Sequence, residues 1–86
     1  MEIDAPDSAV AGTEAKFIIS GLSSLNPADF VVRATANGAA AKFRVVPTPP
    51  DTICVFVRTK RDNTKARVEV GDRLARQSVG VTAYLI

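Results

Sequence analysis

The C-terminal part of the chain carries the pattern that most restricts its fold. From Thr64 to Ile86 the sequence reads as two alternating stretches separated by a polar break. The apolar residues that share one parity are Ala66, Val68 and Val70 in the first stretch and Val79, Val81, Ala83 and Leu85 in the second. A period of two places each set on one face of a β-strand. Two strands alone leave such a face in water, so the preceding residues must cover it.

Earlier stretches continue this alternation. Strands are predicted at Met1–Gly12, Glu14–Leu22, Asp29–Ala36, Ala39–Val46 and Thr52–Lys60, and Pro6 breaks the first of them. Together with the C-terminal pair they make about seven strands, at a spacing of roughly 8–12 residues. Many short strands joined by turns are typical of a β-sandwich. We therefore expect the 86 residues to form a single all-β domain.

The connections predict how these strands are joined. Asn37-Gly38 is the strongest hairpin signal in the chain, because a type I′ turn needs positive φ at both positions. Since proline donates no ladder hydrogen bond, Pro47–Pro50 is expected to end the strand before it and to lead the chain from one sheet to the other. Residues 61–65 are short for a crossing between sheets, which favours a hairpin there.

The core must be built mainly of aliphatic residues, because the chain has four Phe, one Tyr and no Trp. Thr52–Lys60 is apolar on both faces, which indicates a central strand, and Cys54 in this run is expected to be buried and unreactive. As the only cysteine, it forms no intrachain disulfide. The predicted core residues are Phe17, Ile19, Phe30, Val32, Val55, Val57, Val68, Val79 and Val81.

The sequence offers no recognisable catalytic set. It has no histidine, which excludes a Ser-His-Asp triad, a Cys-His pair and a histidine metal ligand. It also lacks a glycine-rich phosphate loop, an EF-hand loop and a CxxC motif. The aspartates beside Pro, Asn or Gly, where this residue commonly serves turn geometry, are Asp4, Asp7, Asp62 and Asp72. We therefore expect a protein that is not an enzyme and has no catalytic, cofactor or metal site.

Charge is distributed unevenly along the chain. The segment Arg58–Arg76 holds seven bases and three acids, whereas Met1–Gly12 holds three acids and no base. Such charge suits either an acidic protein partner or a solvated edge that resists aggregation. Nucleic acid is disfavoured as a partner, because no aromatic residues interleave with the bases. The candidate interface residues are Arg58, Lys60, Arg61, Lys65 and Arg67 in the basic segment and Glu2, Asp4 and Asp7 in the acidic one.

Three stretches carry a resemblance to a known family. They are Ala5-Pro6-Asp7-Ser8-Ala9-Val10-Ala11-Gly12, then Glu14–Gly21 followed by Leu22, and finally Val68–Asp72 leading to Gln77–Ala83. With these motifs the chain resembles a bacterial or phage immunoglobulin-like domain. The resemblance implies a single immunoglobulin-like β-sandwich of about seven antiparallel strands, with residues 1–12 as an N-terminal arm or edge strand. The cysteine pair and buried Trp of antibody domains are missing.

The resemblance also implies a function. Such domains occur in surface adhesins and as additions to tailed-phage capsids and tails, where small decoration (cement) proteins attach to the assembled capsid. The N-terminus has no apolar signal-peptide region and no stretch could span a membrane, which favours the phage use. We therefore expect a non-enzymatic virion protein, made in the host cytoplasm. Its expected partner is the major capsid protein or another virion protein, with self-association on the lattice as a further possibility.

Two alternative functions remain open at the sequence level. One is an immunoglobulin-like module of a bacterial surface adhesin, which would place the chain outside the cell or at its surface. The other is a small carbohydrate-binding β-sandwich. The second is disfavoured, because sugar sites normally present exposed aromatic rings and the chain has no Trp and only Tyr84.

Overall fold

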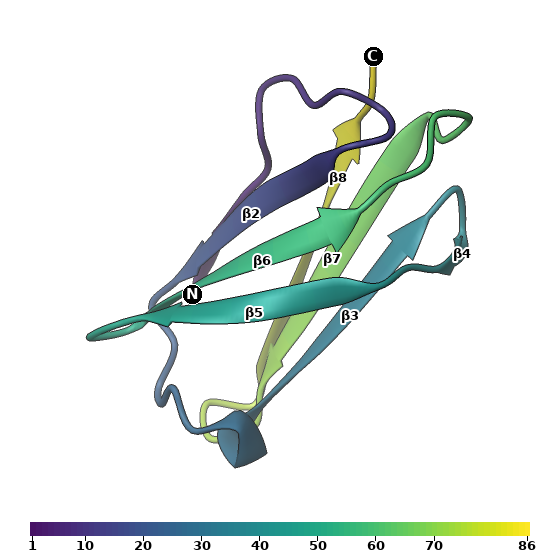
Figure 1. Ribbon diagram of the computed structural model, residues 1–86. Helices are drawn as coiled ribbons and strands as arrows, with labels where there is room; N and C mark the ends of the chain where they lie inside the picture. The colour runs from purple at the N-terminus through teal and green to yellow at the C-terminus, as the bar shows by residue number, and fades with distance from the viewer.

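The computed structural model describes all 86 residues as two antiparallel four-stranded sheets, arranged as two layers (Figure 1). In order across the first sheet lie β1 (Glu2–Asp4), β2 (Glu14–Ser20), β6 (Thr52–Arg58) and β5 (Phe43–Thr48). In order across the second lie β4 (Ala39–Ala40), β3 (Phe30–Ala36), β7 (Lys65–Asp72) and β8 (Gln77–Tyr84). A short 3-10 helix, η1 (Pro27–Asp29), precedes β3. The all-β prediction is confirmed.

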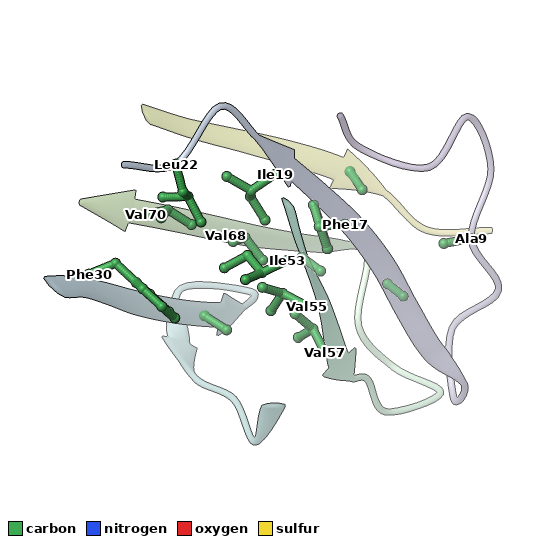
Figure 2. Packing of buried hydrophobic residues seen from close by; sticks show 14 residues of the cluster. Ala9, Phe17, Ile19, Leu22, Phe30, Ile53, Val55, Val57, Val68 and Val70 are labelled. Atoms are coloured by element: carbon green, nitrogen blue, oxygen red, sulfur yellow. The ribbon is translucent and has the colours of Figure 1, made fainter. Parts of the chain in front are cut away.

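One layer of apolar side chains fills the space between the two sheets (Figure 2). The first sheet contributes the alternate residues of β2 and β6, and Phe17, for example, lies opposite Val55 in the register. The second contributes Val68 and Val70 from β7 and Phe30 from β3. The largest side chains with less than 2% exposure are Phe17, Ile19, Ile53, Val55, Val57, Val68 and Val70. The period of two seen in the sequence is therefore the period of the buried face.

The predicted core is confirmed in its centre and differs at its margins. Six of its residues are buried, whereas Val32, Val79 and Val81 are partly buried and pack against the cluster. Val79 and Val81 lie on β8, an edge strand that has a neighbour on one side only. The prediction that Cys54 is buried is wrong. Its neighbours Ile53 and Val55 take the inward parity of β6, so the Cys54 side chain lies on the outer face and is half-buried.

The predicted strand Ala39–Val46 is divided between the two sheets. Ala41 donates a backbone hydrogen bond to Ala34 in the second sheet, whereas the carbonyl of Lys42 accepts one from Arg58 in the first. The chain therefore changes sheets between residues 41 and 42, and the prediction of a crossing at the prolines is wrong. Eight strands result in place of about seven.

The proline stretch closes a hairpin within the first sheet. Pro47 lies inside β5, opposite Ile53 of β6, and the strand continues to Thr48. Proline is tolerated there because β5 is an edge strand, which leaves one side of its backbone without a partner. The prediction that the strand ends at Pro47 is therefore wrong.

Residues 61–65 belong to a crossing between sheets, so the hairpin prediction for them is also wrong. The connection leaves β6 in the first sheet and enters β7 in the second. It is compact because the Lys60 amide donates to Asn63 Oδ1 at 2.7 Å and the Asn63 amide donates to the Lys60 carbonyl at 3.0 Å. Sheets in a sandwich lie only about 10 Å apart, so a few residues suffice to cross.

The N-terminal residues contact both sheets. Strand β1 pairs with β2 at the edge of the first sheet, and Ala9 then forms an isolated parallel bridge with Leu85 beside the second. The Ala11 amide donates to the Ile86 carbonyl, and the Ile86 amide donates to the Ala9 carbonyl, both at 2.9 Å. The segment thus joins the two layers along one side of the molecule.

Asp72 ties two turns together at the end of the molecule that holds η1. Its carboxylate accepts hydrogen bonds from the amides of Leu74 and Ala75 at 3.0 Å and from the amide and hydroxyl of Ser23 at 2.9 and 2.8 Å. These donors, with the Ala75 amide first, lower the pKa of Asp72 from 3.8 to about 2, against the opposing effect of burial. The turn role predicted for this aspartate is confirmed.

We expect Phe17→Ala to lower the free energy of unfolding by about 3–5 kcal/mol, because it removes a fully buried ring and leaves a cavity. Urea unfolding followed by circular dichroism measures the change. Leu74→Ala is the control: Leu74 is 60% exposed, and its loss should change stability by less than about 0.5 kcal/mol. A Phe17→Ala protein as stable as wild type would contradict the facing assigned to β2.

Asp72 should make stability depend on pH in acid. Because its pKa is lowered on folding, its contribution is complete above the unfolded value of 3.8 and disappears as pH falls through about 2. Asp72→Asn should therefore be less stable at neutral pH and show a flatter loss between about pH 4 and pH 2. Ser23→Ala, which removes one donor, should lie between the two. The free energy of unfolding, measured by chemical denaturation at each pH, should show this difference. If it falls with pH at the same rate in wild type and Asp72→Asn, Asp72 does not have this role.

Candidate functional site

Several connections gather at the end of the sandwich that carries the C-terminus, on the right-hand side of Figure 1. They are the β3–β4 turn, the crossing at Ala41–Lys42 and the β6–β7 connection. We call this region the basic end. Its largest hollow, of about 490 Å³, is lined by Ala36, Ala39, Ala40, Ala41, Lys42, Arg58, Thr59, Lys60 and Asn63. Three positively charged side chains therefore share one concave surface with no acid among its lining residues: Lys42 from the crossing, Arg58 from the end of β6 and Lys60 from the β6–β7 connection.

Local hydrogen bonds hold these segments in place. The β3–β4 turn is the predicted two-residue hairpin, with φ of 49° at Asn37 and 81° at Gly38. Asn37 Oδ1 accepts from the amides of Thr64 and Lys65 at 2.8 and 3.2 Å, so the turn is attached to the start of β7. Thr59, only 5% exposed, donates its hydroxyl to the Thr13 carbonyl at 2.6 Å. The charged side chains thus extend from an anchored backbone.

A neighbouring hollow of about 240 Å³ shares Lys42 and Arg58 with the first and adds Glu14, Phe43 and Arg44. Here the one acid is already engaged, because Arg44 Nε lies 3.2 Å from Glu14 Oε2. The Arg44 guanidinium also lies 4.0 Å from the centre of the Phe56 ring. The only other ion pair of the chain joins Arg67 to Glu69, so Lys42, Arg58 and Lys60 have no acidic partner.

Lys65 and Arg67, also predicted as interface residues, lie on the outer face of the second sheet. They line a separate hollow of about 160 Å³ together with Thr35, Asn37, Gly38, Thr82 and Tyr84. Arg67 is held there by Glu69 at 3.2 Å and by the Thr82 hydroxyl at 3.1 Å. Its charge is therefore partly satisfied within the chain, unlike that of Lys42, Arg58 and Lys60.

The remaining predicted residues lie apart from these hollows. The Arg61 side chain runs against Gly12, where a Cβ atom would come within 3.0 Å of Arg61 Cγ. Glu2 and Asp4 belong to the edge strand β1, and Asp7 follows it in the N-terminal segment. The predicted interface set thus falls on several surfaces: the structure brings Arg58 and Lys60 into one hollow and Lys65 and Arg67 into another.

Lys42 is the member of the basic end that sequence reasoning missed. It lies within the strand predicted at Ala39–Val46, and no local pattern places it near Arg58. The structure pairs the two backbones, since Arg58 donates to the Lys42 carbonyl at 2.9 Å. That pairing depends on the register between β5 and β6. The sequence pattern predicts a strand that ends at the prolines, but it does not specify this register.

The basic end can attract and hold an acidic surface. Cations on a concave surface act together on an approaching anion, and their effect weakens as salt is added. No group of three or more His, Cys, Asp or Glu side chains lies close enough to hold a metal ion. Nor does the structure contain a helix with the length and hydrophobicity needed to span a bilayer.

Comparison with known proteins gave no similar protein: no family model, no curated sequence and no solved structure matches this chain.

We expect Asn37→Ala to loosen the basic end and to lower the free energy of unfolding by about 1–3 kcal/mol. The variant loses the acceptor for Thr64 and Lys65 and places alanine at a positive φ. Asn37→Gly is the matched variant, because it loses the same acceptor but tolerates the backbone angle, so it should cost less. Urea unfolding and amide exchange at Lys65 measure both effects. An Asn37→Ala protein with wild-type stability would show that the turn is not held by this side chain.

Proposed function

We propose that this protein is a non-enzymatic accessory structural protein, a capsid decoration (cement) protein whose basic end docks on an acidic surface of the major capsid protein or of another virion protein. The observation that carries the proposal is the group of cations at that end. Lys42, Arg58 and Lys60 line one hollow, and none of them has an acidic partner within the chain. A complementary acidic surface would supply the partners that these side chains lack.

We further propose that the sandwich is immunoglobulin-like, as the resemblance of the N-terminal and C-terminal motifs implies. The strand orders support this. The order β1-β2-β6-β5 corresponds to strands A, B, E and D of an immunoglobulin domain, and β3-β7-β8 corresponds to C, F and G. The two-residue strand β4 then takes the place of an additional strand beside C.

Docking on a lattice suits a small contact surface. The hollow involves only a few charged side chains, which in a single complex would give weak binding. Where many copies bind a fixed array and contact their neighbours, each site raises the effective concentration for the next. A protein of this kind needs no catalytic group. It needs a stable sandwich and a contact surface of defined charge, and the basic end provides such a surface.

The experiment is cosedimentation with capsids of the phage that encodes the chain. The capsids are purified in a form that lacks the decoration protein. We expect wild type to sediment with them and to be released as salt rises past about 0.15 M, where the Debye length falls below about 8 Å. The triple variant Lys42→Glu, Arg58→Glu and Lys60→Glu should remain in the supernatant. Arg33→Glu, Arg73→Glu and Arg76→Glu change the net charge equally at residues outside the hollow and should still sediment.

The possible outcomes separate the alternatives. Equal sedimentation of wild type and the Lys42, Arg58 and Lys60 variant would remove the basic end from the interface. Release of both triple variants would show a response to net charge without a defined site. Wild type that does not sediment at any salt concentration would refute the capsid role and favour the adhesin module.

A further inference from the structure

The layer of side chains between the two sheets does not close at the basic end. Ala36 is the last buried residue of β3, and Ala39 lies directly opposite it in the register. Ala41, which donates its amide to the Ala34 carbonyl, continues the same face. Residues directly opposite each other in an antiparallel pair share one face of the sheet, so these alanines point toward the first sheet. Alanine side chains are small, so they leave space in front of this wall.

The opposite wall of this space is polar. Thr59 continues the inward parity of β6 one step beyond Val57, and its hydroxyl already donates to the Thr13 carbonyl. Arg58 and Lys60 lie on either side of Thr59 in the sequence, and all three line the hollow of about 490 Å³. Sites for small ligands commonly enclose about 300–1,000 Å³. The hollow is therefore an open continuation of the core, with alanines on one wall and cations on the other.

We propose that this hollow takes an extended acidic segment of the partner protein. One apolar side chain of that segment inserts against the alanines, and acidic residues beside it pair with Lys42, Arg58 and Lys60. The inference rests on the proposed function, because it takes the basic end as the docking surface, and it adds what the partner must present there. An apolar anchor in a pocket, surrounded by a polar rim, is the usual arrangement of the residues that dominate a protein interface.

The two walls of the hollow contribute different parts of the binding. Ion pairs between exposed side chains contribute little affinity, because water and salt screen them. An apolar side chain that leaves water adds affinity of its own, and it also excludes water from the ion pairs around it, which strengthens them. The alanine wall therefore provides burial, and the cations select an acidic segment over a neutral or basic one.

Other occupants suit the hollow less well. Single-stranded nucleic acid binds with its bases stacked on aromatic rings, and no aromatic residue lines the hollow. The acidic segment of a second copy is not free to enter as an extended chain, because Glu2 and Asp4 lie in β1, which is paired with β2. A neutral or basic segment would leave the three cations without acidic partners. An acidic segment of a different protein is the occupant that the charge and shape of the hollow favour.

NMR titration of the isotope-labelled protein with short blocked peptides tests the proposal, at peptide concentrations up to about 5 mM because so small a contact binds weakly. The first peptide is acidic with a central leucine, the second has serine in place of the leucine, and the third has lysine in place of each acid. We expect the first to shift the amide signals of Ala39, Ala41 and Lys60. The second should bind about tenfold more weakly, because it buries no apolar side chain. The third should leave these signals unchanged.

A variant that fills the hollow tests the insertion without changing any charge. Ala39→Leu extends the apolar wall into the space, and should remove the preference for the leucine peptide over the serine peptide. Ala28→Leu is the matched control, because it adds the same atoms at an exposed residue outside the hollow and should keep the preference. Thermal denaturation checks that both variants are folded. An Ala39→Leu protein with the wild-type preference would refute the insertion, as would equal binding of the two peptides to wild type.

The remaining outcomes separate this inference from the capsid role. Capsids that retain wild type and Ala39→Leu equally, but release the variant reversed at Lys42, Arg58 and Lys60, would leave the proposed function standing and refute the insertion. Binding of the leucine peptide as expected, with no sedimentation on capsids, would support the hollow as a site for an acidic segment and refute the capsid role. Tighter binding of a single-stranded oligonucleotide, or the same shifts on raising the protein concentration alone, would assign the hollow to nucleic acid or to a second copy and overturn the proposal.

Discussion

The burial of one layer of mostly aliphatic side chains between the two sheets is the constraint on which the rest of the structure depends. Because an 86-residue chain buries little more than about 60% of its unfolded surface, few residues can be spared from that layer. The inward parity of β2, β6, β3 and β7 is therefore almost entirely apolar. What remains for interaction with other molecules is the outward-facing residues, the strand edges and the connections, and the basic end lies among the connections.

Charge gathers at one end of the sandwich because of how the strands are connected. Arg58 ends β6, Lys60 follows it in the crossing, and Lys42 lies where the chain changes sheets. Arg58 and Lys60 are close in the sequence, whereas Lys42 comes from an earlier segment, and the antiparallel pairing of β5 with β6 brings it to the same end. The acids near the N-terminus are placed elsewhere, on β1 and the segment that follows it. The separation of charge in the sequence is thus preserved in space, although the hollow gains Lys42, which was not predicted, and lacks the predicted Arg61, Lys65 and Arg67.

Much of the fold was predictable from the sequence because its determinants are local. The alternation in Glu14–Ser20 and the Asn37-Gly38 turn each depend on neighbouring residues, and the structure confirms both. The change of sheet after Ala41 was not predictable, because it depends on hydrogen bonds to Ala34 and Arg58, which no local pattern specifies. Lys42 was missed for the same reason. Cys54 was misplaced because an apolar run does not reveal which parity faces inward.

The pairing of the central strands also has a consequence for how the chain reaches this structure. The β3–β4, β5–β6 and β7–β8 hairpins join neighbours in the sequence, but β2 pairs with β6 and β3 with β7, so that Phe17 must meet Val55 and Ala34 must meet Val68. Each of these meetings closes a long loop before any apolar contact repays the lost chain entropy. Domains dominated by such distant contacts fold in roughly milliseconds to seconds, whereas helical bundles of similar size fold in microseconds to milliseconds. The hairpins can therefore form and dissolve many times before the two sheets first close over the core.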